Sequence, residues 1–196
     1  MALKPPVEVP QGAIRLNTDS QKLEFFAQDQ WWQMATDVPT LQGGARGVFA
    51  GGYTGGPATL YNNIEYITIP SAGNAIDFGN LTDARDYTAA GSSPTRTCFA
   101  GGRDPSNTNI IDYITTASTG NANDFGDLIT AEMRGVIMSN SSRGVIGSDG
   151  SITNALDYIT FATTGNSLDF GDQVSSSAAP VVYSFGGCSD SHGGIS

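Results

Sequence analysis

Three short segments recur in the same order along this chain, and this repetition constrains the fold more than any other feature. The three copies of each segment read, in chain order, RGVFAGG, RTCFAGG and RGVIGSD from Arg46, Arg96 and Arg143; NIEYITI, IIDYITT and ALDYITF from Asn63, Ile110 and Ala155; and GNAIDFG, GNANDFG and GNSLDFG from Gly73, Gly120 and Gly165. Successive copies lie about 47 residues apart. Such a period indicates a body assembled from copies of one supersecondary unit.

Each recurring segment has the pattern of a β-strand. Apolar and polar residues alternate in the acid-Tyr-Ile-Thr segments, which predicts a strand with two distinct faces. The RGVFAGG segment is apolar and ends in glycines, as a buried strand does where it turns at the end of a sheet. The Gly-Asn pair tolerates positive φ and predicts a hairpin into the Asp-Phe-Gly strand.

A fourth strand is expected between each Asp-Phe-Gly and the next arginine. These strands are predicted over Asp86–Gly91, Gly135–Asn140 and Val181–Gly187. The first copy then begins at its second strand, and a first strand is left over after the third copy. We therefore expect the chain to be permuted against its own repeat, with Val181–Gly187 completing the first copy's sheet in the same chain or in a neighbouring subunit.

The predicted organisation is all-β, with three repeat sheets of four antiparallel strands each and a small N-terminal β-meander. Residues 1–46 form the N-terminal segment, in which AIRLNT, KLEFFA and QWWQMA are expected strands. Residues 47–196 form the repeat domain, with repeats at about 46–95, 96–142 and 143–187. The strands should close as propeller-like blades or as a three-sided β-prism.

Composition argues against several classes of partner. The formal net charge is -10 and lysine occurs only at Lys4 and Lys22, so the chain offers no basic patch and nucleic acid is not an expected partner. No apolar run of about 18 residues is present, so membrane insertion is not expected. The N-terminus does not resemble a cleaved leader. We expect a soluble chain.

No catalytic residue, cofactor or metal ligand is predicted, and the chain is not expected to be an enzyme. The Asp-Phe-Gly triplets occur three times, which indicates a structural role in which the aspartate bonds to nearby backbone N–H groups and the phenylalanine packs inside. The carboxylates at Asp124–Asp127 and Asp169–Asp172 match no calcium loop. His192 is the only histidine and has no cysteine or histidine cluster beside it.

Two further expectations concern charge pairs and thiols. The arginine that opens each copy is expected to pair with the acid before the tyrosine. The expected pairs, one in each copy, are Arg46 with Glu65, Arg96 with Asp112, and Arg143 with Asp157. Cys98 and Cys188 are far apart in sequence, and two reduced thiols are favoured over a disulfide.

Candidate binding residues lie where the copies differ. The loops Tyr53–Asn62, Arg103–Asn109 and Gly150–Asn154 vary in length, and variable loops on a constant scaffold are where specificity resides. The contact residues proposed for a sugar or a protein are Tyr53, Tyr61 and Arg103; the equally weighted alternative is a passive surface. Of the adjacent Trp31 and Trp32, one is expected to face a core and the other a partner, as an anchor or oligomer contact.

The strand with a double glycine, the acid-Tyr strand and the aromatic strand together resemble a Kelch-type β-propeller blade over about Arg46–Gly187. Phe78, Phe125 and Phe170 stand where that family usually has tryptophan, and the third copy has Gly147-Ser148 in place of the double glycine. The sequences RGVFAGGY, NNIEYITI and STGNANDFGDL are similar to repeats in virion proteins of tailed phages, cyanophages especially. Residues 12–35 are similar to a motif common in phage tail and fibre proteins.

The resemblance implies a virion structural protein, such as a fibre, collar, or capsid or tail accessory, located in the virion. Its implied partners are further copies of itself and other virion proteins, and host attachment through a glycan or protein is a further expectation. Propellers typically need four to eight blades, so oligomeric closure is favoured, with two chains forming six blades or a trimer sharing strands as the options beside the prism. The alternative function is a carbohydrate-binding lectin with a β-prism body, and a glycan-cleaving enzyme is the weakest.

Overall fold

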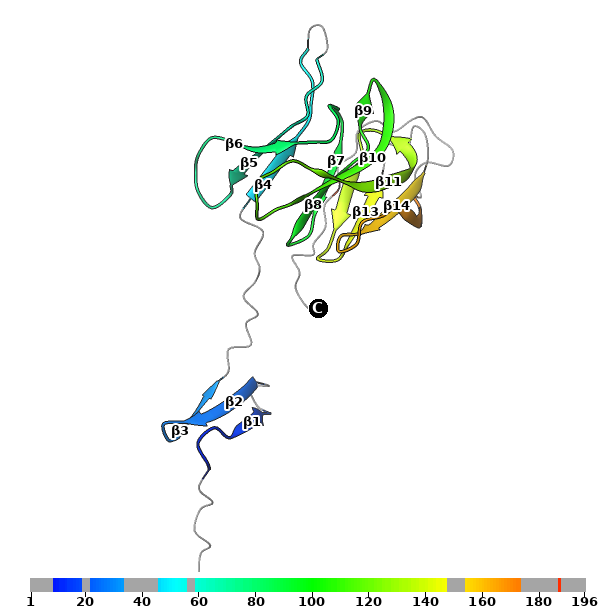
Figure 1. Ribbon diagram of the computed structural model, residues 1–196. Coiled ribbons are helices and arrows are strands. Elements are labelled where there is room, and N and C mark those ends of the chain that lie inside the picture. Colours follow the sequence, from blue (N-terminus) through cyan, green and yellow to red (C-terminus); the bar gives the residue numbers. More distant parts are fainter. Residues whose placement is uncertain are drawn as a thin grey trace, which may run out of the picture. The chain divides into compact units, whose positions relative to one another are not determined.

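The computed structural model describes residues 9–18, 22–33, 46–55, 59–147, 154–173 and residue 187 (Figure 1). Every regular element in these ranges is a β-strand, as the alternating sequence pattern predicts. The chain divides into two compact units, Met1–Gln42 and Gly43–Ser196. No helix in the described part is long and apolar enough to cross a membrane.

The N-terminal unit contains one three-stranded antiparallel meander. Its strands are β1 (Ile14–Asn17), β2 (Lys22–Ala27) and β3 (Gln30–Gln33), in the order β1-β2-β3. Gln28 and Asp29 both have positive φ, 53° and 58°, in the two-residue turn between β2 and β3. Such a turn matches the twist of the paired strands. The predicted meander is therefore present.

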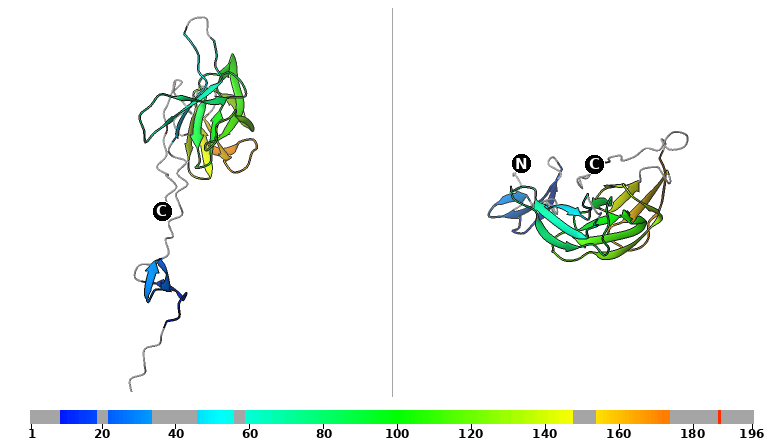
Figure 2. Two further views of the ribbon diagram at one scale, coloured as in Figure 1. Left: turned by 60° about the vertical axis from the view of Figure 1, so that its left-hand side comes forward. Right: turned by 90° about the horizontal axis from the view of Figure 1, so that it is seen from above.

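The second unit contains three antiparallel sheets that follow one another in chain order along an arc (Figure 2). The first sheet is β4 (Arg46–Ala50), β5 (Asn63–Thr68) and β6 (Ile76–Asn80). The second is β7 (Ala89–Ser92), β8 (Arg96–Ala100), β10 (Ser106–Thr115) and β11 (Asn123–Glu132), with β9 (Arg103–Asp104) paired to β10. The third is β12 (Val136–Ser139), β13 (Arg143–Gly147), β14 (Ala155–Thr160) and β15 (Leu168–Asp172).

The strands that precede each arginine belong to the following sheet, as the permuted repeat predicts. β7 pairs with β8, and β12 pairs with β13. Among the described residues, the first sheet has three strands and no strand equivalent to β7. The strand predicted at Val181–Gly187 lies outside the described residues except for Gly187. That glycine is close to β12, because a Cβ added to it would lie 3.0 Å from Cγ2 of Val136.

The Asp-Phe-Gly triplet forms a β-bulge in every sheet. The pairing register shifts at Ile64/Glu65, Ile111/Asp112 and Leu156/Asp157, in each case opposite the triplet's phenylalanine. The glycine that follows has positive φ, for example 145° at Gly126. The extra residue turns Phe78 and Phe125 into the core, where they are 3% and 2% exposed. Phe170 is 49% exposed, so the prediction of an inward phenylalanine is wrong for the third copy.

The core lies between the sheets in two clusters. One joins Ile64, Phe78 and Leu81 to Phe99 and Ile114 of the second sheet. The other contains Cys98, Ile111 and Phe125 on the second sheet and Ile146, Ile159 and Phe161 on the third. Cys98 is a free thiol, as predicted, and burial raises its pKa to about 12. Cys188 lies outside the described residues.

Gly126 permits the close approach of two sheets. A Cβ added there would collide with the carbonyl oxygen of Gly165, which belongs to the third sheet's loop. We expect Gly126→Ala to lower the free energy of unfolding by about 1–2 kcal/mol through the positive φ, with a further loss of about 1–3 kcal/mol from overpacking.

Gly52→Ala is the matched control, because Gly52 has φ of 116° and nothing lies within 4 Å of an added Cβ. It should show only the loss from φ. Urea unfolding followed by fluorescence measures both variants, and equal losses would contradict the close-approach argument.

Candidate functional site

A partly exposed group of aromatic and basic side chains gathers where the connections of the first and second sheets meet. We call it the Tyr–Arg cluster and define it as Tyr53, Tyr87, Arg103 and Arg134. Tyr53 follows β4 and is bridged to Leu60, while Arg103 lies in β9 and is bridged to Asp86. The backbone N–H of Arg134 donates to the carbonyl of Tyr87 at 2.9 Å. Local backbone pairing therefore fixes the position of all four residues.

Tyr87 is the centre of the cluster. Its ring centroid lies 6.0 Å from that of Tyr53, and the guanidinium carbons of Arg103 and Arg134 lie 5.0 and 4.9 Å from it. Tyr87 and Arg134 both have positive φ, 55° and 58°. Non-glycine residues rarely adopt this conformation, and where they do they cluster at functional sites. The geometry places two guanidinium groups beside one aromatic ring.

Hydrogen bonds set the electrostatics of the cluster. Arg103 donates to both carboxylate oxygens of the buried Asp86, at 3.1 and 2.6 Å, and this raises the pKa of Arg103. The hydrogen bond between the two tyrosines raises the pKa of Tyr53 and lowers that of Tyr87, which Arg134 lowers further. Asp86 therefore binds one of the two guanidinium groups that lie beside the Tyr87 ring.

The structure groups some of the predicted binding residues. Tyr53 and Arg103 both contact Tyr87, so they belong to one surface. Tyr61 is 43% exposed and its backbone N–H donates to Gly52, so it lies in the same loop without a ring contact to the cluster. Tyr87, Arg134 and Asp86 were missed, because Asp86 and Tyr87 read as the start of a strand. No sequence signal marks the positive φ of a tyrosine.

The N-terminal sheet has a second exposed surface, which we call the meander's apolar face. It consists of alternate residues on three strands: Ile14, Leu16, Leu23, Phe25 and Trp32, all exposed. The opposite face combines polar and aromatic side chains, with Arg15 paired to Glu24 at 2.8 Å and stacked on Trp31 at 4.1 Å. Hydrogen bonds from Asn17 and Arg15 hold the pKa of Glu24 below its ordinary value.

The two tryptophans therefore have different surroundings. Trp31 packs edge-on against Phe26, with centroids 5.3 Å apart. Trp32 is 43% exposed on the apolar face, and its indole N–H donates to the Ala27 carbonyl at 3.0 Å. An exposed apolar face of this kind indicates a contact surface.

The predicted pairing between the opening arginine and the acid of each copy is wrong. The arginines stack on tyrosine rings instead, at 4.6 Å for Arg46 and Arg96 and 4.5 Å for Arg143. The acid precedes that tyrosine in a strand, so its side chain points to the opposite face of the sheet. Asp112 instead accepts hydrogen bonds from Thr82, and Asp157 accepts them from Ser167 and Ile129.

The Asp-Phe-Gly aspartates are also distributed differently from the prediction. Asp169 accepts a hydrogen bond from the N–H of Gly171 at 3.2 Å, as expected. Asp77 and Asp124 are exposed. In the described ranges, no group of three or more His, Cys, Asp or Glu side chains could hold a metal ion. His192 lies outside those ranges.

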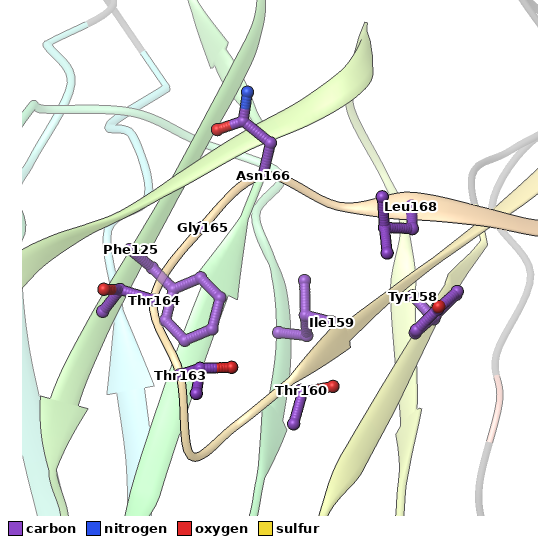
Figure 3. Close-up of a pocket in the computed structure, with 9 residues that line it drawn as sticks. All are labelled: Phe125, Tyr158, Ile159, Thr160, Thr163, Thr164, Gly165, Asn166 and Leu168. Atoms are coloured by element: carbon purple, nitrogen blue, oxygen red, sulfur yellow. The ribbon is translucent and has the colours of Figure 1, made fainter.

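One small hollow lies between the second and third sheets. Figure 3 shows it beneath the loop from Thr163 to Asn166, with Phe125, Tyr158 and Leu168 around it, and its volume is about 160 Å³. Its lining contains hydroxyl and amide groups but no charged side chain. Ligand pockets usually have volumes of about 300–1,000 Å³, so this hollow is not a site for a sizeable ligand.

Comparison with solved structures identifies the fold of this architecture. The structure of YjhT, a Kelch-repeat β-propeller protein, superposes with a TM-score of 0.52 at 7% sequence identity. The match covers 79% of this chain and 59% of YjhT, so the chain spans less than two thirds of that structure's length. No protein-family model and no curated protein matches the sequence. The fold is that of Kelch-type propeller blades, as the repeat predicts.

Asp112 and Asp157 occupy the same position in successive copies, and they allow a matched test of the buried charge. Asp112 pairs with the buried Arg85 at 3.1 Å, whereas Asp157 is satisfied by neutral donors. We expect Asp112→Asn to lower the free energy of unfolding by about 3–5 kcal/mol, because it leaves Arg85 charged and uncompensated.

Asp157→Asn removes a charged acceptor without stranding a cation, so a smaller loss of about 1–3 kcal/mol is expected. Chemical denaturation of the two variants side by side measures the difference. A larger loss in Asp157→Asn would contradict the assignment of the ion pair.

Proposed function

We propose that the protein is a non-enzymatic virion component whose N-terminal sheet anchors it and whose repeat sheets present a binding surface. The observation that carries this proposal is the distribution of exposed side chains. The meander's apolar face lies in one unit, and the Tyr–Arg cluster lies in the other. A chain with an apolar attachment face and a separate polar recognition surface suits a fibre, collar, or capsid or tail accessory.

The virion assignment rests on the resemblance of the repeats and of residues 12–35 to phage structural proteins. The arrangement of charged groups is compatible with a scaffold. Asp112 and Asp157 hold neighbouring sheets together, and Arg103 and Asp86 hold the base of the Tyr–Arg cluster. These residues have structural partners, and we assign them no catalytic step. The work of the protein is assembly and attachment.

The ligand class proposed for the Tyr–Arg cluster is a glycan that carries a carboxylate. Tyrosine rings stack on the apolar faces of sugars, and a guanidinium group pairs with a carboxylate in a planar geometry. The cluster places two guanidinium groups beside one tyrosine ring on a chain with a formal net charge of -10. The same observation favours the alternative function, a carbohydrate-binding lectin that acts outside a virion.

A glycan array with acidic and neutral oligosaccharides tests the recognition surface. We expect the chain to bind carboxylate-bearing glycans, and Tyr53→Ala to weaken binding about tenfold or more by removing the exposed ring beside Tyr87. Tyr61→Ala is the matched control, because Tyr61 is exposed to a similar extent in the same loop but does not contact Tyr87. Equal loss in both variants, or no binding to any glycan, would contradict this assignment.

Mass spectrometry and immunogold labelling of purified virus particles test the virion assignment. The chain should be present in the particles, and a Leu16→Ser, Trp32→Ser variant should fail to be incorporated because its apolar face is disrupted. Gln33→Ser is the control on the same sheet, since Gln33 lies on the opposite face from Trp32. Absence from particles together with glycan binding would favour the lectin.

A further inference from the structure

The two contacts between successive sheets are copies of one another. In each contact, an arginine, a backbone carbonyl pair and a backbone N–H of one sheet bond to the loop of the next. Between the first and second sheets the bonds are Arg46 Nη1 to Thr116 O at 2.7 Å, Gly120 N to Phe78 O at 2.7 Å, Ala122 N to Asn80 O at 2.8 Å, and Asn80 N to Asn121 Oδ1 at 3.1 Å. Between the second and third they are Arg96 Nη1 to Phe161 O at 2.7 Å, Gly165 N to Phe125 O at 2.7 Å, Ser167 N to Asp127 O at 2.8 Å, and Asp127 N to Asn166 Oδ1 at 3.1 Å.

The third sheet has the residues that form the first side of this contact, but no sheet follows it among the described residues. Arg143 stacks on Tyr158 as its counterparts stack on their tyrosines, but it is exposed and bonds to no carbonyl of a following loop in the described ranges. Phe170 is 49% exposed, whereas Phe78 and Phe125 are buried. Gly171 keeps a φ of 138°, and an added Cβ there would meet nothing within 4 Å.

The first sheet has the residues that form the second side of the contact, but within the described ranges no sheet precedes it in the repeat domain. Ile69 is 62% exposed, although the equivalent Thr116 and Phe161 are buried. Phe49 is 58% exposed, although the equivalent Phe99 and Ile146 are buried. The acid of this copy, Glu65, is exposed too, whereas Asp112 and Asp157 are buried.

We propose that the open face of the third sheet docks on the open face of the first sheet of a second copy of this chain. In this contact Arg143 donates to the Ile69 carbonyl, and the N–H of Gly73 donates to the Phe170 carbonyl. Gly171 lies against Gly73, as Gly126 lies against Gly165 within one chain. The exposed Phe170, Phe49 and Ile69 then enter the positions that their counterparts occupy in the two core clusters.

The number of copies follows from the number of sheets. β-Propellers close with four to eight blades, and six is the only multiple of three in that range. Two copies therefore form a ring of six sheets, closed by two identical head-to-tail contacts. Such a contact joins two different faces, and it ends in a closed ring only when the rotation closes.

Light scattering and sedimentation of the full chain test the proposal. The expected mass is twice that of one chain. Gly171→Ala should weaken the dimer at least about tenfold, because the added methyl group meets the Gly73 carbonyl of the second copy. Gly12→Ala, at a positive φ with open space in the N-terminal unit, should leave the dimer intact.

A mixing experiment identifies the head-to-tail geometry. Phe170→Asp and Phe49→Asp should each be monomeric alone, because every contact then contains one damaged face. Mixed together they should form a dimer of intermediate affinity through the one contact in which both faces are intact.

Three outcomes would overturn the proposal. These are a monomeric unaltered chain, a dimer that survives both aspartate variants, and variants that do not associate when mixed although each keeps its native circular dichroism spectrum. The second outcome would assign the dimer to another surface, such as the meander's apolar face.

Discussion

The body depends on the approach of the backbone of one sheet to the bulged strand of the sheet before it. The Asp-Phe-Gly bulge removes one residue from the ladder, so the carbonyl of Phe78 points out of its sheet and accepts the N–H of Gly120 at 2.7 Å. The same bulge directs the phenylalanine ring into the space between the sheets. Only a glycine can follow, because a Cβ at Gly79 would collide with the Gly120 carbonyl. One triplet thus supplies the bulge, the core residue and the intersheet contact.

The contact between the first and second sheets and the contact between the second and third share these backbone hydrogen bonds. They differ in the groups that bind the buried carboxylate. At the first contact Asp112 accepts from Thr82 and pairs with Arg85, whose Nε and Nη1 have no hydrogen-bond partner in the described part of the chain. At the second, Asp157 accepts from the Ser167 hydroxyl at 2.6 Å and from the backbone N–H of Ile129 at 3.0 Å. A neutral donor avoids the desolvation of a second ion. The geometry of the backbone is conserved between the two copies while the side-chain chemistry differs, so the backbone contact and not the ion pair defines the repeat.

The sequence repeat was sufficient to predict the strands, their antiparallel order and the permutation, because each depends on local alternation and on period. It did not predict which face a charged side chain takes relative to its neighbours. Arg46 and Glu65 look like a pair along the sequence, but adjacent strand residues face opposite ways, so the arginine reaches Tyr66 instead. The burial of a repeated phenylalanine also requires a following sheet, which is why Phe170 differs from Phe125. The Tyr–Arg cluster could not be found by pattern, since it joins residues that are far apart in sequence, from the loop after β4, from β9 and from the connections before β7 and β12.

The distinction between repeated and unrepeated residues separates scaffold from function. The residues that recur, such as the opening arginine, the triplet glycine and the loop asparagine represented by Asn121 and Asn166, all act at contacts between sheets. The positions of the Tyr–Arg cluster also correspond in pairs, but their side chains differ between copies. Tyr53 and Arg103 each follow a double glycine, and Tyr87 and Arg134 each have positive φ two residues before the first strand of the next sheet. The repeat therefore accounts for the backbone of the cluster and not for its side chains. Side chains that vary on a repeated backbone are the ones that binding specificity can use, which is why the proposed recognition surface is placed there.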